Sequence, residues 1–97
     1  MVKGTTSSGF EFEYDEARLD DMRFVDVLAV VADDNAGLLP RVKGMSQLIT
    51  MLLGDELKAA LYDHIGKAHD GRVPREDAEA ALSEIMAAAG KDAEKNS

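Results

Sequence analysis

Apolar residues are most concentrated between residues 24 and 32, where Asp26 alone interrupts a run of apolar side chains. A helix that is apolar around most of its circumference has to be covered by its neighbours. The pattern extends back to Glu16, and acidic side chains in its first half suit the amino-terminal end of a helix dipole. The β-branched valines would also suit a strand, but the length of the pattern favours a helix. The sequence therefore predicts a central, buried helix over residues 16–32.

Three later segments carry narrower apolar stripes with helical spacing. Pro40 suits the first turn of one helix, and Gly54 followed by Asp55 is typical of one helix ending and another beginning. Pro74 begins the last segment and Gly90 ends it. The expected helices cover residues 40–53, 55–69 and 74–89. The fold is thus expected to be mainly all-α, a small four-helix domain around a central apolar helix.

The N-terminal part of the chain shows a different periodicity. Residues 10–14 alternate strictly between aromatic and acidic side chains, which predicts an extended arm or short β-strand with one aromatic face. No second convincing strand follows, so this segment is expected either to lie on the protein's own core or to pair with another chain. Residues 1–9 are expected to be a flexible arm, residues 10–90 a single helical domain, and residues 91–97 a disordered tail.

Charge is unevenly distributed along this chain of net charge −8. Residues 11–34 contain nine acidic and two basic residues, whereas residues 35–54 contain Arg41 and Lys43 and no acid. No basic footprint of useful size exists for nucleic acid, and an anionic membrane surface is disfavoured for the same reason. There is neither a signal-peptide pattern nor an apolar run long enough to span a membrane, so the expected location is the cytoplasm.

Two acidic residues, Asp33 and Asp34, follow the predicted central helix at its carboxyl end. Negative charge there opposes the helix dipole. We expect these carboxylates either to be balanced by Arg41 or Lys43, or to be held for a binding partner.

No pattern of residues points to catalysis, a metal or a cofactor. The loop at Asp70 is similar to the middle of an EF-hand, but the matching register places Gly66 and Ala68 at positions that need oxygen ligands. His64 and His69 are five residues apart, so they do not face one ion from the same side of a helix. There is no cysteine, no phosphate-binding glycine loop and no nucleophile with an evident base. We expect a binding protein rather than an enzyme.

Three segments then carry a family resemblance: residues 18–28 (RLDDMRFVDVL), 57–65 (LKAALYDHI) and 70–74 (DGRVP). They resemble the tail assembly chaperones of long-tailed bacteriophages and prophages of Gram-positive bacteria, and the similarity covers about residues 10–90 in order. The resemblance implies a small, acidic, largely helical protein of the host cytoplasm that is absent from the mature virion. Such proteins bind the tape measure protein, keep it soluble and help tail tube protein assemble around it.

The same resemblance bears on the end of the chain. Many members of the family are made in a short form and a longer form, through a programmed −1 ribosomal frameshift. Glu94-Lys95-Asn96 can be encoded as GAA-AAA-AAC, which contains the slippery heptamer A-AAA-AAC. Gly90-Lys91 can be encoded as GGG-AAA, the beginning of another such site. The codons around the stop decide whether this chain has a longer form.

The family role agrees with the residue pattern, because a chaperone for an apolar client needs apolar contact surface on a charged body. The expected partners are the tape measure protein, tail tube protein and a second copy of the chain. The alternative is a small acidic regulatory or inhibitory protein that mimics DNA and binds a basic partner; a small joining protein of the virion is a third. The residues expected to bind the partner are Phe10, Phe12, Tyr14, Asp33, Asp34, Arg41 and Lys43.

Overall fold

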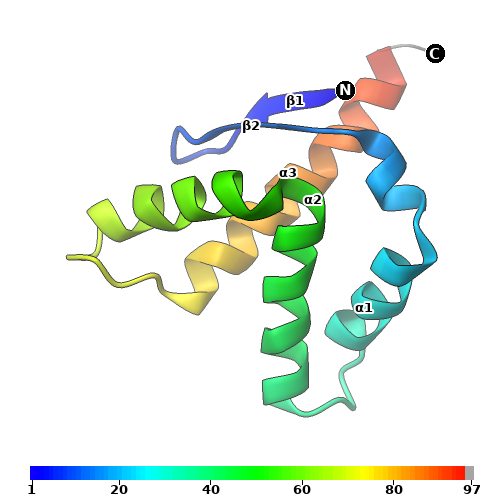
Figure 1. The fold of residues 1–97 in the computed structure, drawn as a ribbon, viewed down its shortest axis with the longest axis horizontal. Helices are drawn as coiled ribbons and strands as arrows, with labels where there is room; N and C mark the ends of the chain where they lie inside the picture. Colours follow the sequence, from blue (N-terminus) through cyan, green and yellow to red (C-terminus); the bar gives the residue numbers. More distant parts are fainter. Residues whose placement is uncertain (96–97) are drawn as a thin grey trace.

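The computed structural model describes residues 1–95, with side chains up to Gly90. The chain is mainly helical, as predicted, and a small antiparallel sheet lies at its N-terminus (Figure 1). Among the described residues, no helix combines the length and the apolar character needed to cross a membrane. The elements in order are β1 (Val2–Thr5), β2 (Glu11–Tyr14), the 3-10 helix η1 (Glu16–Asp20), α1 (Met22–Ala32), α2 (Leu38–Lys67) and α3 (Arg75–Lys95).

The two strands form a hairpin: β1 lies where a flexible arm was expected, and β2 lies in the segment expected to be extended. The register runs from Val2 opposite Tyr14 to Thr5 opposite Glu11. In the turn, Gly9 has a φ of 97°, a conformation that glycine adopts at no steric cost. The prediction of a flexible arm over residues 1–9 is therefore wrong for β1, and the aromatic segment does have a strand partner within the chain.

The predicted helix over residues 16–32 is wrong as a single element. Asp21 has an extended backbone (φ −120°, ψ 124°) and its side chain accepts a hydrogen bond from the Arg23 amide at 2.8 Å. Asp15 caps η1 in the same way, accepting from the Ala17 amide. The aspartates that were expected to support one helix through its dipole instead cap two shorter ones. In α1 only Phe24 is buried, so α1 is not the central element.

The central element is α2, which contributes the fully buried Leu48, Ile49, Leu52 and Leu61. It turns sharply at Gly54 (Figure 1), whose φ of 81° and ψ of 171° lie in a region essentially restricted to glycine. The two arms, residues 38–53 and 55–67, match the predicted helices over 40–53 and 55–69. The predicted helix break at Gly54 is therefore confirmed as a bend within α2.

One lysine spans this bend. The ammonium group of Lys58, in the second arm, donates to the Ser46 carbonyl at 3.1 Å, to the Ser46 hydroxyl at 2.8 Å and to the Thr50 hydroxyl at 2.8 Å. It also lies 5.5 Å from the centre of the Tyr62 ring. These contacts satisfy its three N–H donors and hold the two arms in their relative orientation.

The last helix, α3, begins one residue after Pro74, close to the predicted start of residue 74. Its backbone continues through Lys95, beyond the predicted end at residue 89, so most of the expected disordered tail is helical. Residues 96–97 of that predicted tail lie outside the described residues. Ala78, Ala81, Leu82 and Ile85 of α3 enter the core, which the N-terminal sheet and α2 complete.

Candidate partner-binding surface

The α1–α2 hairpin, defined as α1, residues 33–37 and the first arm of α2, is the part of the molecule with the most exposed apolar surface. Its two helices pack closely because Gly44 lies in the contact: a Cβ atom added there would lie 2.8 Å from Cγ2 of Val31 and 3.4 Å from Cγ1 of Val27. Phe24 is buried on the same inner side of α1. Only some of the apolar residues of α1 therefore lie on the side that packs against α2.

The opposite side of α1 is exposed and mainly apolar, with Arg23 and Asp26 as its charged residues. Met22, which is 68 % exposed, lies on this side together with Val25, Ala29 and Ala32. A helix on the surface of a globular protein normally places polar residues on its outer face. An exposed apolar patch on such a face makes it a candidate surface for binding another chain.

The apolar surface continues at the start of α2. Leu38 is 60 % exposed and Leu39 is 80 % exposed. Among the described residues, every large apolar side chain that is exposed lies on α1 or in this first turn, except Met1. We call this set the apolar hairpin surface; it consists of Met22, Val25, Ala29, Val30, Ala32, Leu38 and Leu39.

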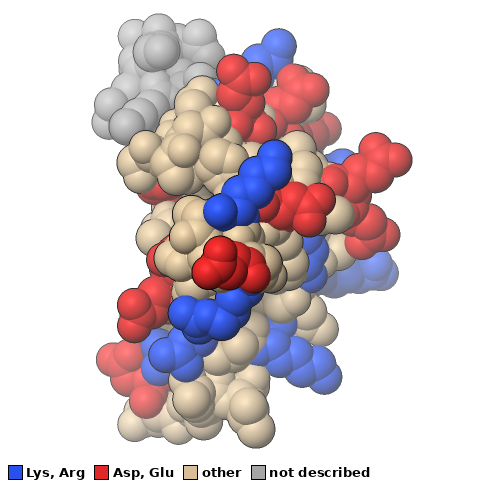
Figure 2. Space-filling model, turned by 90° about the vertical axis from the view of Figure 1, so that its left-hand side faces the viewer, with Lys and Arg blue, Asp and Glu red and all other residues tan. Residues whose placement is uncertain are grey.

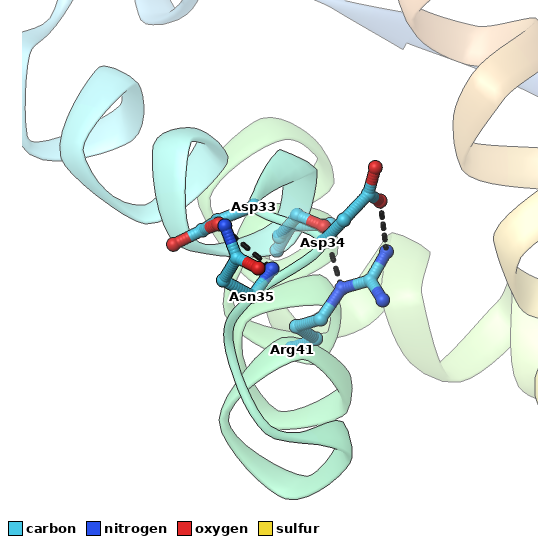
Figure 3. Close-up of polar contacts among 5 residues, drawn as sticks. Asp33, Asp34, Asn35 and Arg41 are labelled. Carbon is cyan, nitrogen blue, oxygen red and sulfur yellow. Dashed lines mark hydrogen bonds and ion pairs between the residues drawn. The ribbon is translucent and has the colours of Figure 1, made fainter.

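Asp33, Asp34 and Arg41, three of the residues predicted as partner contacts, lie at the tip of this hairpin (Figure 3). Nε of Arg41 donates to the Val31 carbonyl at 3.0 Å, and its Nη2 lies 3.8 Å from Oδ1 of Asp34. Asp33 faces away from Arg41 and accepts a hydrogen bond from the Asn35 amide at 2.9 Å. Arg41 thus binds a carbonyl at the carboxyl end of α1 and balances one of the two acids, as expected.

Lys43, the other basic residue considered for this role, does not join that cluster. It is exposed, and no salt bridge of the described residues involves it. The ion pair between Arg41 and Asp34 is itself exposed on the Asp34 side, so it contributes little to stability. Asp33, Asp34 and Lys43 are thus exposed and Arg41 is partly buried, and contact of these four residues with a partner stays a prediction.

The aromatic residues predicted to contact a partner are in the core instead. Phe10, Phe12 and Tyr14 are all buried, and the Tyr14 hydroxyl donates to the Ile85 carbonyl at 2.8 Å. The Phe10 ring lies 5.7 Å from the ring of His64. Of the two alternatives open for this segment, folding onto the protein's own core is correct and partner contact through these side chains is wrong.

A groove lies between the hairpin and α3, with a volume of about 300 Å³. Three helices line it: α1, the first arm of α2, and α3. We call it the three-helix groove. Its lining residues are Leu28, Val31, Leu38, Arg41, Val42, Met45, Leu48, Arg75, Glu79, Leu82, Ser83 and Met86.

The histidines make pairwise contacts. Nε2 of His64 donates to the Ser8 carbonyl at 3.1 Å and lies 3.2 Å from the Ser8 hydroxyl, while His69 pairs with Asp77. No carboxylate orients His64 among the described residues, so Ser8 and His64 lack the third group of a catalytic triad. Among all the residues that the structure describes, no group of three or more His, Asp or Glu side chains is arranged to hold a metal ion.

The sequence did contain a pattern that indicates the apolar hairpin surface, but this pattern led to the prediction of a buried helix. The apolar run at residues 24–32 predicted a buried helix because it left no polar face. The adjacent Leu38 and Leu39, directly before Pro40, are a second signal that the helical stripe of α2 does not use. No protein-family model matches this chain, and neither a curated protein nor a solved structure is significantly similar to it.

Proposed function

We propose that this protein is a tail assembly chaperone, which binds the tape measure protein in the host cytoplasm and keeps it soluble while the tail tube assembles. The proposal begins from the resemblance of residues 18–28, 57–65 and 70–74 to that family. One observation about the molecule supports it most: a row of apolar side chains is exposed on a helical hairpin of a protein with net charge −8. That combination suits a carrier of an apolar client.

In this proposal the client binds the apolar hairpin surface. A Leu or Val side chain contributes about 1.5–3 kcal/mol when it is fully buried, so partial burial of a few of them gives reversible binding. Reversibility is needed, because the chaperone has to leave when tail tube protein takes its place and is absent from the virion. The acidic body of the protein stays in solvent, and its charge opposes aggregation of the loaded complex.

A second candidate is an acidic regulatory protein that binds a basic partner by mimicking DNA. The net charge of −7 over residues 11–34 favours this function. However, acidic and basic side chains are interspersed on the face of the molecule that Figure 2 shows. The two candidates differ in their response to salt, since contact between charged surfaces weakens steeply with ionic strength and burial of apolar surface does not.

Co-expression with the tape measure protein from the same genome tests the proposal. We expect the tape measure protein to be soluble with the wild-type chain and to aggregate with Leu38→Ser/Leu39→Ser. Both side chains are exposed, so the variant should melt within a few degrees of wild type. The complex should persist in 0.5 M salt. Absence of this protein from purified virions would separate a chaperone from a joining protein.

Two results would contradict the proposal. One is a tape measure protein that aggregates equally with and without the wild-type chain. The other is a complex that dissociates in 0.5 M salt and is unaffected by the leucine substitutions, which is the behaviour expected of an acidic mimic.

A further inference from the structure

The three-helix groove has an apolar floor whose side chains come from all three helices. Leu28 and Val31 of α1 and Met86 of α3 line it and are partly buried, and Met45 of α2, which is buried in the core, lines it as well. Two methionines in the lining make the floor adaptable, because the unbranched thioether side chain changes shape easily. The groove is therefore suited to apolar side chains of a partner.

The charges at the groove are opposite to those of the molecule as a whole. Arg41 and Arg75 line it together with one acid, Glu79, on a protein with net charge −8. Arg75 is the first residue of α3, where a positive charge opposes the helix dipole, and no salt bridge of the described residues involves it. Arg41 is held in place by its hydrogen bond to the Val31 carbonyl. Arg41 already lies 3.8 Å from the exposed Asp34 carboxylate, so Arg75 is the guanidinium group that would gain most from a partner's carboxylate.

We infer that the three-helix groove binds an amphipathic helix of the client that carries carboxylates beside its apolar face. This inference rests on the proposed function and adds a second contact, for a further segment of the client, to the one at the apolar hairpin surface. A helix fits because it satisfies its own backbone hydrogen bonds, whereas an extended peptide needs a sheet edge and no strand lines the groove. Apolar side chains at positions i, i+3 or i+4, and i+7 would contact the floor, and acidic neighbours would reach Arg41 and Arg75.

A photo-activated cross-linker tests where the client binds. Ser83 is exposed and lines the groove, so benzoylphenylalanine placed there should cross-link to co-expressed tape measure protein. The same cross-linker at Ala59, which is exposed on the second arm of α2 and does not line the groove, is the control and should give little product. Mass spectrometry of the Ser83 product then identifies the client segment, which can be synthesised as a peptide.

The synthetic peptide tests the chemistry of recognition. It should gain helical circular dichroism on binding, and Arg75→Glu should weaken its binding about tenfold, the change that 1.4 kcal/mol produces. Arg72→Glu makes the same change of charge at an exposed residue outside the groove and should leave the affinity within twofold. Replacing the peptide's acidic residues with Lys should weaken binding to the wild-type protein and much less to Arg75→Glu.

Each other outcome overturns a distinct claim. If the wild-type chain keeps the tape measure protein soluble but Ser83 gives no more product than Ala59, the groove is not the site and the proposed function stands. If Ser83 cross-links to a second copy of the chain, the groove is a contact between copies. Equal effects of Arg75→Glu and Arg72→Glu would eliminate recognition of carboxylates. A tape measure protein that aggregates with the wild-type chain would reject the proposed function itself.

Discussion

At the scale of single residues, two glycines determine where apolar side chains lie. Gly4 faces the ring of Phe12, and a Cβ atom there would lie 2.7 Å from the ring's Cζ. The alternation at residues 10–14 correctly predicted one aromatic face, but the same pattern suits a core and an interface equally. The strand that pairs with it, Val-Lys-Gly-Thr, has no apolar alternation of its own, so the sequence could not show that these aromatic side chains are buried.

Gly44 sets the distance between α1 and α2, which leads to a prediction about stability. Gly44→Val should lower the free energy of unfolding by about 1–3 kcal/mol, because the added methyl groups would overlap the side chain of Val31. Denaturant unfolding measures this change. Gly90→Val is the matched control, since no atom lies within 4 Å of a Cβ added at Gly90, and it should be nearly neutral. Equal effects of the two substitutions would mean that α1 does not pack on α2 at Gly44.

At the scale of elements, the sequence predicted helix ends better than it predicted which helix is central. Gly54, Pro74 and the stripes located the ends of both arms of α2 and the start of α3 to within about two residues, whereas α3 continues through Lys95, past its predicted end at residue 89. The segment 16–32 failed because Asp15 and Asp21 act as caps, an interaction that depends on local backbone angles rather than on apolar periodicity. The bend in α2 could be located from Gly54, but its direction is set by contacts such as those of Lys58, which no local pattern encodes.

The bend gives a second prediction. Gly54→Ala should destabilise the fold by about 1–3 kcal/mol, since an L-residue is strained at a φ of 81° and a ψ of 171°. A chain made by peptide ligation with D-alanine at this position should be as stable as wild type, because a D-residue adopts these angles readily. Thermal melting of the three proteins measures the difference. If L-alanine and D-alanine have the same effect, α2 is not bent at Gly54.

At the scale of the whole molecule, the chain divides its apolar residues between a closed core and an open hairpin. The N-terminal sheet, α3 and most of α2 bury theirs, whereas α1 buries only Phe24 and, with the first turn of α2, leaves several large apolar side chains exposed. The sequence left open whether Arg41 or Lys43 balances Asp33 and Asp34 or whether a partner does, and in the structure Asp34 lies beside Arg41. It could not separate an apolar helix that the fold buries from one that a partner covers, because both have the same composition.

The central claim is that the outer face of α1 holds the client, and one comparison of matched variants tests it most directly. Ala29 on that face and Ala59 on the second arm of α2 are both exposed helical alanines with an aspartate four residues later. Changing either to Lys alters the net charge equally and should leave melting unchanged. The measurement is the fraction of co-expressed tape measure protein that stays soluble. We predict that Ala29→Lys lowers this fraction severalfold and Ala59→Lys does not; equal fractions for both variants would contradict the account.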